Sequence, residues 1–162
     1  MFVNGCFNIS SAALCHLVES CKGTLLDFEC ACNDQPDFKN DIMLKLGTCW
    51  NLVTLDVTGC TKIDDMGYMN LAKGEAQLRA GLSAVQPGLV RMLTFKAGNT
   101  KVTDHGLSCI AKCCPNIEHL ELNRADLTDV GTKCIATGLP KLKFLDLTAV
   151  SGITLAMLDE IK

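Results

Sequence analysis

One spacing recurs along this chain and constrains its fold more than any other feature. Apolar residues stand at the first, fourth and sixth of six positions, as in Leu52, Leu55 and Val57. Steps of 27, 38, 27 and 25 residues separate the first members of successive copies. A period of this length predicts a solenoid, in which each repeat buries its apolar face against the next. The five copies are Leu25, Phe28, Cys30; Leu52, Leu55, Val57; Val90, Leu93, Phe95; Ile117, Leu120, Leu122; and Leu142, Leu145, Leu147.

A second landmark follows the apolar triplet in most repeats. It is an aliphatic residue and then a residue that commonly caps helices. Ser, Thr and Asp in that place can accept hydrogen bonds from the free N–H groups of a first helical turn. Each repeat is therefore predicted to be a short strand, a turn and a helix. The pairs are Ile63-Asp64, Val102-Thr103, Leu127-Thr128 and Ile153-Thr154.

The combined pattern resembles the cysteine-containing class of leucine-rich repeats, as found in F-box/leucine-rich-repeat substrate receptors. The segments CWNLVTLDVTGCTKIDDMG and VTDHGLSCIAKCCPNIEHLEL carry the resemblance most clearly. It implies an α/β leucine-rich-repeat solenoid, a right-handed horseshoe arc with short parallel strands on the concave face and helices on the convex face. Residues 32 to 41, CNDQPDFKND, lack the aliphatic-cap pair, so an irregular turn is expected there.

The whole chain, residues 1–162, is expected to be one leucine-rich-repeat domain of about five to six repeats. Its first residues align with the middle of a strand, because Val3 takes the place of Val57, and its last residues align with a convex helix. We therefore expect a domain truncated at both ends. Residues 74–86 are predicted to be an insertion within one repeat, helical in composition, with Leu78, Leu82 and Val85 on one stripe.

Composition excludes several classes of partner. The net charge of −3 and a pI near 5.5 leave no basic footprint for nucleic acid. The sequence has no run near the ~20 apolar residues that a membrane span needs. Eleven cysteines, an odd number, fit thiols kept reduced inside a cell. We expect an intracellular protein, cytoplasmic or nuclear, while a mitochondrial or other organellar location stays open.

Eight of the eleven cysteines occupy positions that recur in the repeat, so packing explains them without a metal-binding or redox role. Cysteine packs as a small apolar residue, and we expect Cys30 in the strand core. Three cysteines, Cys15, Cys32 and Cys113, have no such place, although alternation with Cys30 predicts that Cys32 also faces the core. The repeat assignments are Cys6 and Cys60, with Asn99 in the same role, at the turn; Cys21, Cys49 and Cys114 at helix ends; and Cys109 and Cys134 at equivalent helix positions.

The sequence gives little support for a metal site or a catalytic site. His105, Cys109 and Cys113 lie four residues apart and form one helical stripe of zinc-compatible side chains. We expect this stripe to face outward as a partly exposed helix surface, because at about 100° per residue it lies roughly 200° around the helix from Leu107. A zinc site normally also draws ligands from a second element, and the sequence has no second pair at C-x-x-C spacing. The nucleophile-elbow, P-loop and H-E-x-x-H patterns are absent from the sequence. We therefore predict no metal, no cofactor and no enzymatic activity.

Residues between the core positions of each strand are expected to face solvent on the concave side. They form three columns across the repeats, and four of the five residues in the middle column are acidic. We predict a surface for a protein partner with basic groups. The columns are Asp27, Thr54, Met92, His119, Phe144; then Glu29, Asp56, Thr94, Glu121, Asp146; then Ala31, Thr58, Lys96, Asn123, Thr148, and the predicted contact residues are Glu29, Asp56, Met92, His119, Glu121, Phe144 and Asp146.

The leading functional interpretation is a non-catalytic protein–protein interaction module. The family resemblance implies the substrate-recognition or adaptor part of a ubiquitin-ligase-type receptor. Two alternatives stay open: a structural leucine-rich-repeat subunit of a large intracellular assembly, and a thiol or metal sensor. In the first two cases the chain is part of a larger complex.

Overall fold

The computed structural model describes residues 1–6, 8–32, 39–81 and 88–154, with side chains for all of these except 75–81 and 88. Five strands of three residues each form one parallel sheet in the order β1-β2-β3-β4-β5. Every strand pairs with the strand of the next repeat, so sequence order and spatial order coincide. The strands are β1 Asp27–Glu29, β2 Thr54–Asp56, β3 Thr94–Lys96, β4 His119–Glu121 and β5 Phe144–Asp146.

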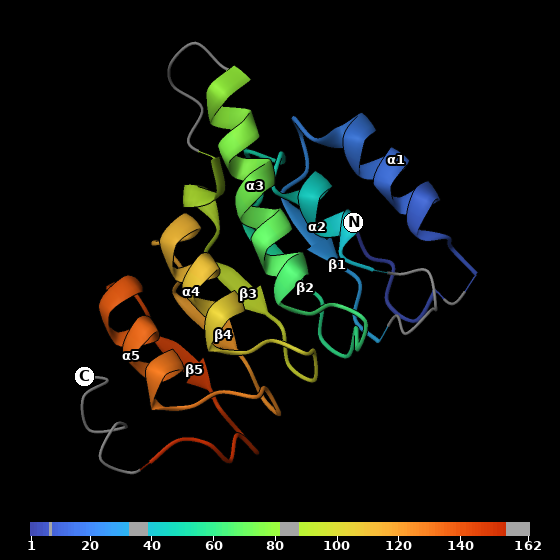
Figure 1. The fold of residues 1–162 in the computed structure, drawn as a ribbon. Helices are drawn as coiled ribbons and strands as arrows, with labels where there is room; N and C mark the ends of the chain where they lie inside the picture. The colour runs from blue at the N-terminus through green and yellow to red at the C-terminus, as the bar shows by residue number, and fades with distance from the viewer. Residues whose placement is uncertain (7, 33–38, 82–87, 155–162) are drawn as a thin grey trace.

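The helices form a second layer over one face of this sheet (Figure 1). Each α-helix packs against the helix of the next repeat, and the other face of the sheet carries no helix among the described residues. Strand, turn and helix alternate along the described chain as the repeat pattern predicts. The helices are α1 Ser11–Cys21, α2 Asp41–Leu46, α3 Asp65–Gly81, α4 Asp104–Cys113 and α5 Asp129–Gly138, with a short 3-10 helix η1 at Gly88–Arg91.

The core lies between the two layers. The central residue of each of the first four strands is completely buried: Phe28, Leu55, Phe95 and Leu120. Each full burial of such a side chain contributes about 1.5–3 kcal/mol relative to exposure. The repeats are too small to bury these residues alone, so the core exists only because neighbours stack.

Carboxylates join the helix starts of successive repeats. Asp65, the first residue of α3, accepts hydrogen bonds from the N–H (2.9 Å) and hydroxyl (2.6 Å) of Thr103, which caps α4. Asp104 makes the same pair of contacts with Thr128, at 2.9 and 2.6 Å. Helices α4 and α5 are therefore each capped by a threonine, and that threonine is fixed by the aspartate of the repeat before.

Glycine at the third position of α4 permits this contact. Gly106 donates its N–H to Asp65 Oδ1 at 3.1 Å. A Cβ at that position would collide with the same carboxylate oxygen. An Asp and, two residues later, a Gly follow the cap position in these repeats. Both serve one contact, the close approach of a carboxylate to the N-terminus of the next helix.

The third repeat is displaced from the predicted register by two residues. Thr94, Phe95 and Lys96 pair with Thr54, Leu55 and Asp56. The core triplet is therefore Met92, Phe95 and Ala97, and not Val90, Leu93 and Phe95. Met92 is completely buried, so its predicted place on the concave face is wrong. The sequence misled because Val90 and Leu93 fit the aliphatic spacing better than methionine and alanine do.

A turn with a left-handed residue follows each strand, and it corrects two predictions about side chains. Cys32, with φ of 58°, is exposed and does not face the core, because strand alternation has ended by Glu29. Asn99, with φ of 54°, holds this left-handed position and not the place of Cys60. Thr100 takes that place, and its hydroxyl donates to the Ala97 carbonyl at 2.8 Å.

The predicted insertion falls within the longest helix and beyond it. Helix α3 has 17 residues and ends at Gly81. Residues 82–87, and the side chains of the predicted stripe Leu78, Leu82 and Val85, lie outside the described part of the chain. An insertion at 74–86 stays a prediction. Of the helices that the structure describes, none combines the length and the apolarity that crossing a membrane requires.

We expect Asp104→Ala to lower the free energy of unfolding by about 0.5–1.5 kcal/mol, because it removes the hydrogen bonds that the exposed Thr128 N–H and hydroxyl donate to the carboxylate. Asp126→Ala is the matched control, since Asp126 is exposed and should change stability by less than about 0.5 kcal/mol. Urea unfolding followed by circular dichroism measures both. Equal effects of the two substitutions would contradict a role of the carboxylate in joining repeats.

Candidate functional site

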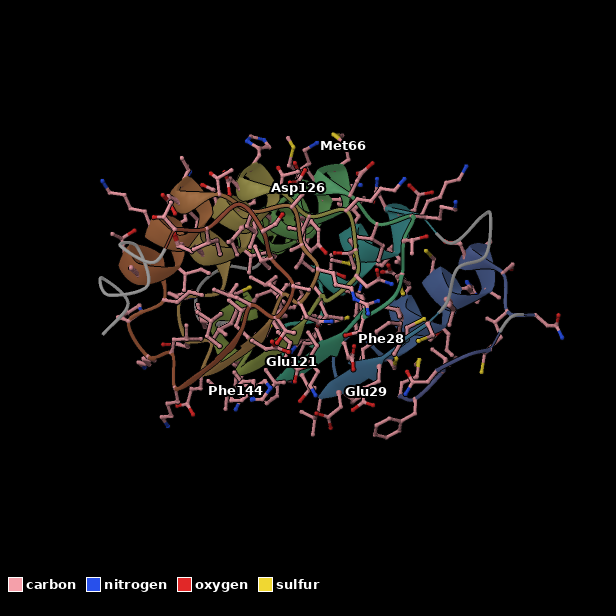
Figure 2. The ribbon with its side chains drawn as sticks, turned by 90° about the horizontal axis from the view of Figure 1, so that it is seen from below. Phe28, Glu29, Met66, Glu121, Asp126 and Phe144 are labelled. Carbon is pink, nitrogen blue, oxygen red and sulfur yellow. The ribbon has the colours of Figure 1, made fainter. Side chains whose placement is uncertain are left out.

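The concave surface is defined here by the outward residues of the five strands. Figure 2 places Glu29, Glu121 and Phe144 along one side of the molecule, opposite Met66 on the helical side. Its middle column carries Lys96 where threonine was predicted, because of the register of the third repeat. The acidic column is therefore interrupted by a cation. The concave surface comprises Asp27, Glu29, Thr54, Asp56, Thr94, Lys96, His119, Glu121, Phe144 and Asp146.

Three of these side chains form a charged cluster around Glu121. The Lys96 ammonium lies 3.0 Å from Glu121 Oε1, and His119 Nε2 lies 2.7 Å from the same oxygen. Partial burial tends to raise the pKa of the Glu121 carboxyl, but the hydrogen bonds from His119 and Lys96 outweigh it, and that pKa is lowered. The hydrogen bond to Glu121 likewise raises the pKa of Lys96. Glu121 is therefore ionised and held in a fixed position near neutral pH.

Phe144 lies flat on the other side of this cluster. Its ring stacks on His119 with centroids 4.2 Å apart and planes 9° from parallel. Nearly half of Phe144 is exposed to solvent, at 48%. The stack fixes the position of both rings, so the concave surface presents a preorganised aromatic group beside charged ones.

The other predicted acidic residues have weaker contacts. Asp56 accepts the N–H of Thr58 at 2.9 Å, and Asp146 accepts the N–H of Thr148 at 2.8 Å. Hydrogen bonds from the Thr148 hydroxyl and N–H lower the pKa of Asp146. Glu29 lies 3.5 Å from the Asn4 amide. The structure therefore brings His119, Glu121 and Phe144 together and leaves Glu29, Asp56 and Asp146 as separate half-buried carboxylates.

A row of residues at the start of the strands was missed by the sequence analysis. It follows the first core residue of each repeat, and its backbone groups already join the parallel ladder, as when Leu93 donates its N–H to the Val53 carbonyl at 2.9 Å. Leu26 is 52% exposed and Leu93 is 39% exposed. The sequence does carry a signal for this row, because the residue after the first core residue is apolar in the first three repeats. We call this set the edge row: Leu26, Val53, Leu93, Glu118 and Lys143.

The predicted thiol stripe is not an exposed surface. Cys113 is buried, with its sulfur 3.4 Å from that of Cys114, while His105 is exposed and Cys109 is half-buried. Helix α4 ends at Cys113, where its last turn packs into the core. The expectation that the stripe faces outward is therefore wrong for Cys113. Among the residues that the structure describes, no group of three His, Cys, Asp or Glu side chains could hold a metal ion.

A comparison with protein-family models agrees with the repeat architecture. Residues 113–136 match the family model described as Leucine Rich repeat. No curated protein matches the chain. Among solved structures, it is similar to a chain of the Rad7 and Elc1 complex in yeast, at 14% identity and a TM-score of 0.45 over 98% of this chain. It covers 58% of that chain, less than two thirds of its length.

The matched segment, the repeat period and the ordered parallel strands identify the fold as an α/β leucine-rich-repeat solenoid. Proteins of this repeat family generally serve as interaction modules and bind other proteins.

Thiol reactivity should follow burial. Burial, with a smaller contribution from Cys21, raises the pKa of Cys49 to about 12. Its neutral thiol is favoured by folding, so the stability that it contributes is present below the unfolded value of 9.0 and is lost as pH rises through about 12. At pH near 8 we expect an aromatic disulfide reagent to modify exposed Cys32 first and Cys49 only upon unfolding. Mass spectrometric mapping checks the order, and Cys32→Ser should remove the fastest phase.

We expect Glu121→Gln to lower the free energy of unfolding by less than about 1 kcal/mol, because the ion pairs are partly exposed to solvent. Since folding lowers the pKa of Glu121, the stabilisation is present above the unfolded value of 4.5 and is lost as pH falls through the lower folded value. Urea titrations of both proteins across this range measure the difference. A difference that grows under acidic conditions would be inconsistent with the cluster.

Proposed function

We propose that this chain is a non-catalytic protein-interaction module that binds a protein partner through the concave surface. The observation that carries the proposal is the fixed, exposed ring of Phe144 on His119, beside the Lys96–Glu121 ion pair. Interfaces commonly concentrate binding energy in an aromatic anchor surrounded by polar groups. Preorganisation favours binding further, because the free side chains lose little conformational freedom in the complex.

We further propose that the module acts inside the cell as the substrate-recognition or adaptor part of a ubiquitin-ligase-type receptor. The sequence resemblance to F-box/leucine-rich-repeat receptors supports this role. The chain has eleven cysteines, an odd number, which fits thiols kept reduced in a reducing compartment. The test is co-purification of the tagged full-length protein with ubiquitin-ligase scaffold subunits, together with accumulation of its bound partner when the protein is depleted. A partner complex without any ligase subunit would refute the receptor role and leave the interaction module standing.

Substitutions on the concave surface should weaken partner binding without unfolding the protein. We expect Phe144→Ala, and the pair Asp56→Lys with Glu121→Lys, each to reduce capture of the co-purifying partner by about tenfold or more. Both remove surface groups and leave the buried core residues unchanged. Quantitative pull-down measures capture, and circular dichroism confirms the fold.

Met66→Ala is the matched control, because Met66 is 50% exposed on the helical side. It should leave capture unchanged. If the concave substitutions also leave capture unchanged, the interface lies on the helical side or in residues 74–86.

A further inference from the structure

The edge row divides the rim of the concave surface into two unlike halves. On β1, β2 and β3 it is aliphatic, with Leu26, Val53 and Leu93. On β4 and β5 it is charged, and Glu118 and Lys143 pair at 2.7 Å. Neighbouring strands lie about 4.8 Å apart, so three aliphatic side chains at matching positions form a continuous strip.

Charges divide one strand earlier, between β2 and β3. In the β3–β5 half, Glu121 and Glu118 have cationic partners in Lys96 and Lys143. In the β1–β2 half, Asp27, Glu29 and Asp56 make no salt bridge with any residue that the structure describes.

Two cations lie close to these carboxylates, Lys96 and the N-terminal ammonium of Met1, which donates to the backbone carbonyl of Asp27. Asp56 and Glu29 contribute to the raised pKa of Lys96, after its hydrogen bond to Glu121. Its ion pair nevertheless goes to Glu121, at 3.0 Å. The aliphatic strip thus borders three carboxylates without a salt bridge, whereas in the other half Glu118 and Glu121 are paired and, of the described carboxylates on the strands there, Asp146 is left without one.

The opposite border of the strip is polar and already hydrogen-bonded. The Asn51 amide donates to the Gly23 carbonyl at 2.8 Å, and Arg91 donates to Asn51 Oδ1 at 2.5 Å. These groups have internal partners on the solenoid. The guanidinium of Arg91 keeps its positive charge because its partner is a neutral amide, and the unpaired carboxylates lie on the sheet side of the strip.

Isolated exposed aliphatic residues are ordinary on protein surfaces. Leu17 on α1 and Val130 on α5 are of this kind. The strip differs because its three members are adjacent, come from three consecutive strands and lie against carboxylates. A partner that covers such a strip gains free energy, because it removes apolar surface from water.

We propose that Leu26, Val53 and Leu93, with Asp27, Glu29 and Asp56 beside them, form a docking surface for an extended segment of a partner protein that carries aliphatic and Lys or Arg side chains. An extended segment points alternate side chains to opposite sides. Aliphatic groups can then cover the strip while basic groups reach the carboxylates. This inference rests on the proposed interaction function and specifies the partner's chemistry.

Selection from a displayed library of random dodecapeptides on the immobilised wild-type chain tests the proposal. We expect the enriched peptides to be basic and to contain aliphatic residues. Their affinity, measured by fluorescence anisotropy, should fall about tenfold or more for Glu29→Lys with Asp56→Lys, and for Leu26→Ser with Leu93→Ser.

Two matched controls separate this site from general acidity and general apolarity. Asp146→Lys reverses an acidic residue of the same column in the other half, and Val130→Ser removes an exposed aliphatic residue from α5. Both should change the affinity by less than about twofold. A loss of affinity with Asp146→Lys equal to that with the double reversal would overturn the proposal, as would enrichment of acidic peptides or of none.

A measurement on the wild-type chain removes dependence on the folding of the variants. Amide resonances of Leu26, Val53 and Leu93 should shift on titration with an enriched peptide, and those of α5 should not. Peptides that shift residues around Phe144 instead, and lose affinity with Phe144→Ala, would overturn this docking surface while supporting the concave surface as an interface.

Discussion

The contact between one repeat's aspartate and the next repeat's helix-capping threonine is the interaction on which the spacing of this solenoid depends. It appears between Asp65 and Thr103, and between Asp104 and Thr128. Asn40 makes the corresponding contact with Asp64, donating to its carboxylate at 2.8 Å and accepting its N–H at 3.2 Å. A carboxylate near a helix N-terminus is also favoured by the free N–H groups there. Helix position is therefore set by polar contacts, while the apolar core supplies most of the driving force.

Much of this architecture could be read from the sequence, because repeated spacing is a strong constraint. The central residues of four of the five strands, all but that of β3, and the threonine caps follow directly from periodicity and capping chemistry. The burial of Met92 was not predicted, because methionine and alanine replace the usual aliphatic residues in the repeat that follows the long helix α3. Another aliphatic spacing, two residues away, fits the pattern better. The exposure of Cys32 was not predicted, because side chains alternate between the two faces only inside a strand. The left-handed turn begins just after the strand ends. Side-chain contacts such as the stack of His119 on Phe144 depend on rotamers that no spacing encodes.

The register of the third repeat, which differs from the predicted one by two residues, also changes the electrostatics of the concave surface. With Lys96 in the middle column, the carboxylates no longer form one continuous field. One half neutralises Glu121 and presents an aromatic ring, and the other presents carboxylates beside aliphatic side chains. The two halves can therefore recognise different parts of one partner, or two partners of different chemistry. A uniform acidic column would have attracted any basic surface, so the interruption favours selectivity over general attraction.

The left-handed turns after the strands link the repeats in one direction. The left-handed residues after the first four strands donate their N–H groups to a carbonyl of the following repeat, as Asn99 does to Asn123 at 2.7 Å and Arg124 does to Thr148 at 2.9 Å. A non-glycine residue in this conformation costs roughly 1–2 kcal/mol on its own. An earlier repeat therefore relies on its successor to hold its turn, and an isolated repeat would relax. Cooperativity in this molecule is thus asymmetric: loss of a later repeat releases the turn before it, whereas loss of an earlier repeat leaves the turn after it in place.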